Sequence, residues 1–198
     1  MNRIKPPAPE QIPANTAAII EASDQLMGFA ANDIRVMAKW PALLDAMSGV
    51  VNVVYGDGEV HSSLKRLVAY VASTAAGCRY CEAHTALGAL DAGTEAEKIS
   101  AVWEFETSAL FTPAERAALR IARGGGIQPN GVTDAEFADL LTHFNEQAAL
   151  EIVAVIALFG FLNRWNDTLA TQLEDEPTAA AQSLHQGNWD GGKHTRAD

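Results

Sequence analysis

Helix-start signals recur along the 198-residue chain, and they restrict its fold more than any other feature of the sequence. Thr94, Thr112 and Thr133 are each followed three residues later by a glutamate. A hydroxyl at such a position caps free backbone N–H groups, and the glutamate completes a capping box. The alternation of apolar and polar residues that marks strands is nearly absent. The sequence therefore predicts an all-α fold.

Glycine, proline and asparagine separate the helical stretches, as they do at helix ends. The expected helices cover residues 16–31, 33–55 with a break at Pro41, 61–76, 78–92, 95–108, 113–123, 133–143 and 146–173. The segment Val50–Tyr55 is rich in β-branched residues, so a short strand is the alternative there, although it has no evident partner.

The helical stretches form one domain over residues 14–173, which two segments of different composition flank. Residues 1–13 contain several prolines and are expected to form an extended N-terminal arm. Residues 174–198 are polar and glycine-rich, so we expect a C-terminal tail that folds only against another surface. Trp189, Lys193 and His194 are unusual in such a tail. Disorder is the default interpretation, and packing over a neighbouring subunit near its cysteines is the alternative.

The charge of the chain limits its partners. Fourteen basic and twenty-five acidic residues give a formal net charge of -11, which repels phosphate backbones and anionic lipid. Neither nucleic acid nor a membrane is therefore an expected partner. The longest apolar run, Ile152 to Leu162, is too short to span a bilayer and fits a buried helix. The N-terminal residues lack the apolar block of a secretory signal, so a cytoplasmic location is expected.

The two cysteines of the chain lie three residues apart in the segment GCRYCEAHT, residues 77–85. Gly77 should end one helix, which places Cys78 at the start of the next, where the helix dipole lowers a thiol's pKa. On a helix Cys78 and Cys81 point about 60° apart, with Cα atoms roughly 5 Å apart, which is within disulfide range. His84 follows Cys81 by three residues and shares this face.

Two thiols and an imidazole on one helix face suit peroxide reduction. A thiolate attacks the peroxide and becomes a sulfenic acid, and the second thiol condenses with it to a disulfide. The imidazole relays the protons. The position of Cys78 at the helix start favours Cys78 as the attacking sulfur, whereas the nearness of His84 favours Cys81. We prefer Cys81 on this spacing, with Cys78 as the resolving cysteine.

A metal site and a thioredoxin-like domain are the other interpretations of a C-x-x-C pair. Zinc usually takes four ligands, and the chain has no third cysteine and only scattered histidines. A thioredoxin-like domain requires strands around the motif. We therefore expect no metal and no organic cofactor, because the redox equivalents of a dithiol cycle through the cysteines themselves.

Two apolar helical stretches of the chain are similar to each other. Residues 66–82, RLVAYVASTAAGCRYCE, align without gaps on residues 151–167, EIVAVIALFGFLNRWND. The simpler explanation is that buried helices look alike. The alternative is a duplicated helical unit, which would place residues 163–167 opposite the cysteine motif.

The segment AAGCRYCEAHTALGAL, preceded by LKRLVAYVAST, resembles the carboxymuconolactone decarboxylase-like superfamily, in particular its alkylhydroperoxidase D-like (AhpD-like), peroxidase-related branch. The resemblance covers roughly residues 33–177. It implies an all-helical fold, homo-oligomers that are trimers or hexamers, and a cysteine pair that reduces peroxides or exchanges with a partner's disulfide. By position, Cys81 matches the peroxidatic cysteine, Cys78 the resolving cysteine and His84 the proton-relay histidine.

The chain departs from the pattern of this family at two places. Its best-characterised members carry C-x-x-C-x-x-x-H, one residue longer than here, which moves the imidazole by about 100° around the helix. They also carry a general-base glutamate twelve residues before the first cysteine, where this chain has Arg66, which cannot accept a proton. Glu106 is our preferred replacement because its segment is rich in aromatic residues. The other candidates are Glu82, Glu104 and Glu151.

The sequence thus predicts a homo-oligomeric thiol oxidoreductase of the alkylhydroperoxidase D-like type, acting on a small organic hydroperoxide or on a partner's disulfide. The expected catalytic residues are Cys78, Cys81, His84 and Glu106. Two alternatives remain open. One is a lyase of the decarboxylase branch, acting on a small lactone acid without need of the cysteine pair. The other is a non-catalytic helical assembly module with inert thiols.

Overall fold

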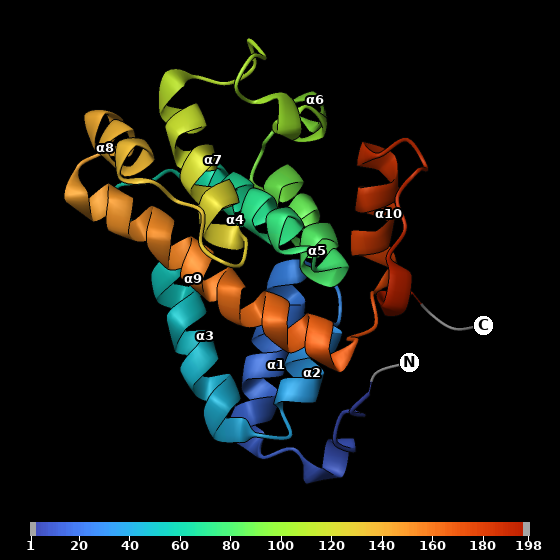
Figure 1. Ribbon diagram of the computed structural model, residues 1–198. Coiled ribbons are helices and arrows are strands. Elements are labelled where there is room, and N and C mark those ends of the chain that lie inside the picture. The colour runs from blue at the N-terminus through green and yellow to red at the C-terminus, as the bar shows by residue number, and fades with distance from the viewer. Residues whose placement is uncertain (1–2, 196–198) are drawn as a thin grey trace.

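The computed structural model describes residues 3–195, and within them every regular element is a helix (Figure 1). The helices are α1 (Ala14–Met27), α2 (Asn32–Met37), α3 (Pro41–Tyr55), α4 (Ser62–Ala76), α5 (Arg79–Asp91), α6 (Ala96–Ser100), α7 (Pro113–Gly126), α8 (Asp134–His143), α9 (Glu146–Leu169) and α10 (Asp175–Leu184), with 3-10 turns η1 (Pro9–Gln11), η2 (Val102–Glu104) and η3 (Gly192–His194). The prediction of an all-α fold is confirmed, and Val50–Tyr55 belongs to α3 rather than to a strand.

The helix α4 forms the centre of the bundle. It packs against α5, α7 and α9, and its residues 67–73 are almost completely buried. Gly77 ends α4 with a positive φ of 77°, a conformation that favours glycine. The backbone N–H of Cys78 then donates to the carbonyl of Ser73, which closes a Schellman-type turn. This turn reverses the chain and starts α5 beside the helix that it follows.

The helix α9 is long and apolar enough to cross a membrane by length and composition alone. In the structure it contacts α3, α4, α5, α7 and α8, which is the environment of a core helix. Its last turns carry Asn163, Asn166 and Asp167. The end of α9 therefore brings polar groups to the side of the bundle where α5 begins.

Two of the three predicted capping boxes form. Thr112 and Thr133 accept hydrogen bonds from the N–H groups of Glu115 and Glu136, whose side chains accept in return. The third is wrong, because α6 begins at Ala96 after Glu95. The N–H of Thr94 instead donates to Ala89, within the turn that ends α5. The expected helix 95–108 is likewise only α6 followed by η2.

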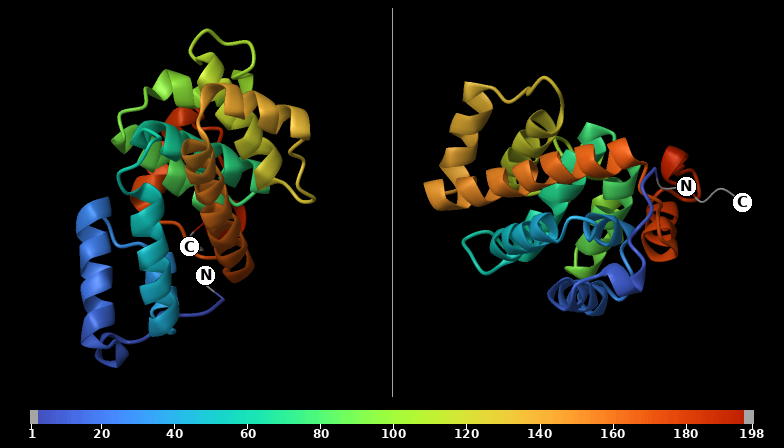
Figure 2. Two further views of the ribbon diagram at one scale, coloured as in Figure 1. Left: turned by 90° about the vertical axis from the view of Figure 1, so that its left-hand side faces the viewer. Right: turned by 90° about the horizontal axis from the view of Figure 1, so that it is seen from below.

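Both terminal segments pack onto the same chain and lie on one side of the molecule (Figure 2). Near the N-terminus, Arg3 bonds the carbonyls of Thr168 and Leu169 at the end of α9. At the C-terminus, α10 packs along α5, and η3 also contacts α5. The C-terminal tail is thus ordered over its own subunit. Residues 1–2 of the expected arm and 196–198 of the expected tail lie outside the described residues.

We expect Gly77→Ala to lower the free energy of unfolding by about 1–2 kcal/mol, because alanine is strained at this positive φ. Gly49→Ala is the matched control: Gly49 lies inside α3, and an added Cβ there meets nothing within 4 Å. That variant should gain about 0.5–1 kcal/mol from helix propensity. Urea denaturation of both variants measures the difference, and equal effects would contradict a strained turn at Gly77.

Candidate functional site

The two cysteines lie at the start of α5, as the sequence predicts. Cys78 is the N-cap residue and Cys81 lies in the first turn. Both cysteines are free, and each residue is only 1% exposed. The carbonyl of Cys78 accepts the first helical hydrogen bond, from the N–H of Glu82 at 2.9 Å. Cys78 therefore lies where the first N–H groups of α5 have no partner within the helix.

The two thiols differ in acidity. A hydrogen bond from the Cys81 side chain lowers the pKa of the Cys78 thiol, and it outweighs the opposing effect of burial. Backbone N–H groups of Cys81 and Tyr80 act in the same direction. Burial, followed by the interaction with Cys78, raises the pKa of the Cys81 thiol well above its ordinary value. Cys78 is therefore the sulfur that ionises first, and Cys81 remains a donor.

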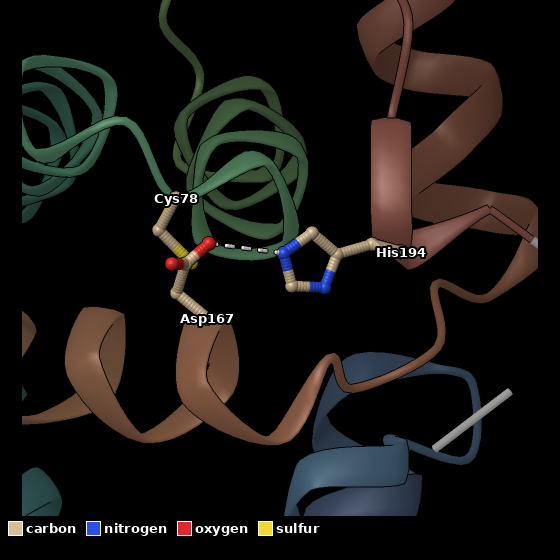
Figure 3. Close-up of side chains that lie close together, drawn as sticks. All are labelled: Cys78, Asp167 and His194. Atoms are coloured by element: carbon tan, nitrogen blue, oxygen red, sulfur yellow. Dashed lines mark hydrogen bonds and ion pairs between the residues drawn. The ribbon is translucent and has the colours of Figure 1, made fainter. Parts of the chain in front are cut away.

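Asp167 and His194 converge on Cys78 from two other segments, as Figure 3 shows. The sulfur of Cys78, a carboxylate oxygen of Asp167 and a ring nitrogen of His194 all lie within 4.8 Å of one another. Asp167 comes from the last turn of α9 and His194 from η3. Burial disfavours ionisation of Asp167, but Lys193, at 2.7 Å, and His194 outweigh it and lower the pKa of this carboxyl. These three side chains are also of types that bind zinc, although zinc commonly takes four ligands.

Asn166 links Cys81 to a partly buried carboxyl group. Its Nδ2 donates to the sulfur of Cys81 at 3.5 Å and to Oδ2 of Asp33, on α2, at 3.3 Å. Burial raises the pKa of Asp33, although the charge of His84 opposes the shift. The raised pKa favours the protonated form of Asp33. A single residue, Asn166, bridges this carboxyl group and the sulfur of Cys81.

Among the described residues, His84 makes no hydrogen bond to either sulfur. Its Nε2 lies 2.7 Å from a carboxylate oxygen of Glu174, and its ring stacks on Tyr80 with centroids 4.2 Å apart. The hydroxyl of Tyr80 donates to the other oxygen of Glu174 at 2.9 Å. On the helix His84 lies about 60° from Cys81 and about 120° from Cys78. Its ring pairs with Glu174 at the start of α10. A direct relay by His84 stays a prediction without a supporting contact.

No contact among the described residues joins Glu106, the preferred replacement acid, to the cysteines. Its side chain is 40% exposed and pairs with Arg120 at 2.7 Å, which lowers the pKa of the Glu106 carboxyl. Only Val102 and Phe105 of the turn in this aromatic-rich segment face the core, which leaves Glu106 on the surface. Arg66, at the position of the family glutamate, lies over the ring of Tyr55, 3.7 Å from its centre.

Glu82 and Glu151, two other candidate acids, have structural partners. Glu82 is buried, and one of its oxygens accepts a hydrogen bond from Nε1 of Trp189 at 3.1 Å, which ties the tail to α5. Glu151 accepts backbone hydrogen bonds from residues 59 and 60 and pairs with Lys65 at 3.0 Å. Burial alone would raise its pKa, but these bonds lower the pKa of Glu151 to about 2. Neither group is placed as a base for the cysteines.

The preferred interpretation of the sequence left out several residues of the site. Asn166 and Asp167 lie at the cysteines, as the duplicated-unit interpretation of residues 151–167 predicts. The sequence singled out His194 only as one of three residues that are unusual in a polar tail. Nothing in the sequence singled out Asp33 or Glu174, because each lies at a helix start, where acidic residues are common.

Comparisons with known proteins give a family profile and one curated relative. The profile of the carboxymuconolactone decarboxylase family matches residues 35–124. Uncharacterized protein YnjA of Escherichia coli (strain K12) is 32% identical over 92 residues, which are 46% of this chain. The match spans half the length of YnjA.

Solved structures match over nearly the whole chain. The apo debrominase Bmp8 is 33% identical, with a TM-score of 0.85 over 91% of this chain and 97% of its own. A cysteine-to-alanine variant of Bmp8 in complex with 2,3,4-tribromopyrrole is 32% identical, with the same TM-score, over 91% and 96%. An uncharacterized peroxidase-related protein from Ralstonia eutropha JMP134, with an alkylhydroperoxidase AhpD core, is 23% identical at a TM-score of 0.80, over 89% and 94%, and shares the fold.

The acidity of each thiol can be measured from the ultraviolet absorbance of thiolate against pH. In Cys81→Ser, which keeps a hydroxyl donor, Cys78 should titrate below the ordinary thiol value of about 8.5. In Cys81→Ala the donor is lost, so the pKa of Cys78 should rise relative to Cys81→Ser. In Cys78→Ala the remaining Cys81 should titrate highest. If Cys81 alone titrates lower than Cys78 alone, the assignment of the two sulfurs is wrong.

Proposed function

The chain belongs to the carboxymuconolactone decarboxylase family, and we propose that it is a thiol oxidoreductase whose cysteine pair carries two electrons. The observation that carries the proposal is the placement of two free thiols in the first turn of α5, with Cys78 at the N-cap and Cys81 three residues later. It leaves one sulfur as a nucleophile and the other as a protonated resolving group. Solvent is near, because the side chain of Asp167, within 4.8 Å of the Cys78 sulfur, is 43% exposed.

The proposed reaction oxidises the cysteine pair with a small organic hydroperoxide. The thiolate of Cys78 attacks the terminal peroxide oxygen, the O–O bond breaks, and the alkoxide leaves and takes a proton. The sulfenic acid on Cys78 then reacts with the thiol of Cys81, which forms the disulfide and releases water. One hydroperoxide and two thiols thus give one alcohol, one water and one disulfide. A dithiol or two thiols of a partner return the disulfide to the reduced state.

These roles reverse the assignment that spacing alone favours. Cys81 was preferred as the attacking sulfur because of His84, but His84 pairs with Glu174. The raised pKa of Cys81 disfavours it as a thiolate, whereas a protonated thiol is suited to resolve a sulfenic acid after losing its proton. Cys78 is therefore the attacking sulfur in this proposal.

Intact-mass spectrometry after addition of one equivalent of cumene hydroperoxide tests the reaction. The wild-type protein should lose two hydrogens, and Cys78→Ser or Cys81→Ser should abolish this loss. In Cys81→Ser, dimedone should trap a sulfenic acid on Cys78. In Cys78→Ser, dimedone should trap little sulfenic acid on Cys81. Trapping on Cys81 instead would reverse the roles of the sulfurs, and intact thiols in the wild-type protein would remove the peroxidase proposal.

The similarity to Bmp8 over almost its whole length favours a second candidate function, the reductive removal of bromine from a small aromatic ring. The same thiolate would attack the bromine atom, and the ring carbon would take a proton in its place. Cys81 would then displace bromide from the sulfur of Cys78. One carbon–bromine bond and two thiols thus give one carbon–hydrogen bond, one disulfide and hydrogen bromide.

A single-turnover comparison separates the candidates. Reduced protein is mixed with 2,3,4-tribromopyrrole or with cumene hydroperoxide, and disulfide formation and free bromide are followed. Faster oxidation with stoichiometric bromide release would favour the dehalogenase, and faster oxidation by the hydroperoxide would favour the peroxidase. A lyase on a small lactone acid would turn over even when both cysteines are replaced by serine, and that result would contradict both proposals.

We also propose that the chain forms homo-oligomers through its exposed apolar surface. On α9, Leu150, Val153 and Phe161 are exposed, and on α3 Val53 is 80% exposed. A groove of about 740 Å³ runs along the outer face of α9. Light scattering after size-exclusion chromatography should give a multiple of the 21.1 kDa chain mass. Val153→Glu should shift the protein toward the monomer, whereas a wild-type monomer would contradict the proposal.

A further inference from the structure

His194 is built into the centre of the site although it belongs to the C-terminal tail. The residue is 1% exposed. Its backbone carbonyl accepts a hydrogen bond from the N–H of Leu173 at 2.9 Å, and its ring lies 6.0 Å from the ring of Tyr80. Burial and the backbone hydrogen bond together hold His194 in one position.

One backbone contact determines which ring nitrogen carries the proton. Nδ1 of His194 lies 2.7 Å from the carbonyl oxygen of Thr171, which can only accept a hydrogen bond. Nδ1 therefore holds the hydrogen of the neutral ring, and Nε2 holds the free lone pair. Nε2 lies 3.5 Å from Oδ1 of Asp167, a contact in which the imidazolium Nε2–H donates to the carboxylate, and the same nitrogen is on the side of the ring toward Cys78 (Figure 3). The basic nitrogen faces the sulfur that ionises.

We propose that His194 is the base that takes the proton of Cys78, and that Asp167 is a positioning residue for the resulting imidazolium. This inference rests on the proposed thiol chemistry. The proton moves from the Cys78 sulfur to Nε2, either directly after a small side-chain movement or through one water, since a ring nitrogen of His194 lies within 4.8 Å of this sulfur. The imidazolium Nε2–H then donates to the Asp167 carboxylate. When the O–O or carbon–bromine bond breaks, the same proton passes to the leaving oxygen or the ring carbon, which restores neutral His194.

The acid–base role explains the surroundings of His194 better than a metal does. The titratable and charged groups that face it are Asp167 from α9, Cys78 and Tyr80 from the start of α5, and the adjacent Lys193. The ammonium of Lys193 pairs with one oxygen of Asp167 at 2.7 Å. Its positive charge would repel a metal ion bound to the same carboxylate. A neutral base that becomes a cation only transiently suits this arrangement.

The position of His194 gives the tail a function. The hydrogen bond between Trp189 and buried Glu82 holds the tail against α5, and η3 follows a few residues later. Docking of the tail thus completes the site by supplying the base. His84, which the family pattern would use, keeps its contact with Glu174 at the start of α10. The tail therefore supplies an imidazole to the sulfurs from a different part of the chain.

The test compares wild type with His194→Gln, Asp167→Asn and the control His143→Gln, which changes a histidine on α8 away from the site. The first measurement is the thiolate titration of Cys78 in a Cys81→Ser background, which requires no substrate. His194→Gln should raise the pKa of Cys78 by about one unit or more, because the thiolate loses its imidazolium partner. Asp167→Asn should shift it less, and His143→Gln should leave it unchanged.

The second measurement is the rate of disulfide formation against pH with the oxidant that proves active. His194→Gln should lose on the order of 100-fold or more near neutral pH and recover at high pH, where Cys78 ionises without a base. Urea denaturation checks that the variants are folded, and a uniform loss at all pH values would indicate a structural role and overturn the inference. So would an unchanged pKa of Cys78, or one tightly bound zinc ion per wild-type chain that His194→Gln abolishes. If no oxidant acts on the wild type, the proposed function fails, whereas the titration still decides the role of His194.

Discussion

The burial of α4 among α5, α7 and α9 is the constraint on which the rest of the structure depends. Burial of a leucine or valine side chain contributes about 1.5–3 kcal/mol, and Leu67, Val68 and Val71 of α4 are almost fully enclosed. The helix can end only where the chain can reverse, which is at Gly77. The next residue is Cys78, so the turn that the core requires also places the reactive sulfur. The segment Gly77–Cys78 thus serves both the packing of the core and the position of the thiol.

The polar groups around this segment are arranged so that buried charge has partners. Glu174 is shared by His84, Tyr80 and the backbone of α2, and Glu82 by Arg79 and Trp189. A buried carboxylate without such partners would cost several kcal/mol. These contacts hold α2, α10 and the tail against α5. The two acids thus serve the assembly of the site, which leaves Asp167 and His194 beside Cys78 for proton transfer.

Much of the fold could be predicted from local patterns. The hydroxyl and glutamate pairs at Thr112 and Thr133 start helices because capping acts within four residues. The same rule fails at Thr94, where the backbone is already used to end α5. The position of Glu106 on the surface, paired with Arg120, shows a related limit. Composition shows that a segment has aromatic residues, but only packing determines which of its side chains turn inward.

The sequence by itself determined the helical class, the N-cap position of Cys78 and the spacing that brings two sulfurs within reach of each other, because these depend on neighbours along one helix. Only the tertiary structure decided which imidazole faces which sulfur. His84 is close to Cys81 in sequence, but its ring pairs with Glu174. His194 is more than a hundred residues from Cys78 and reaches it because the tail folds back over α5. The side chains that control proton transfer are set by packing between distant segments, which local spacing does not encode.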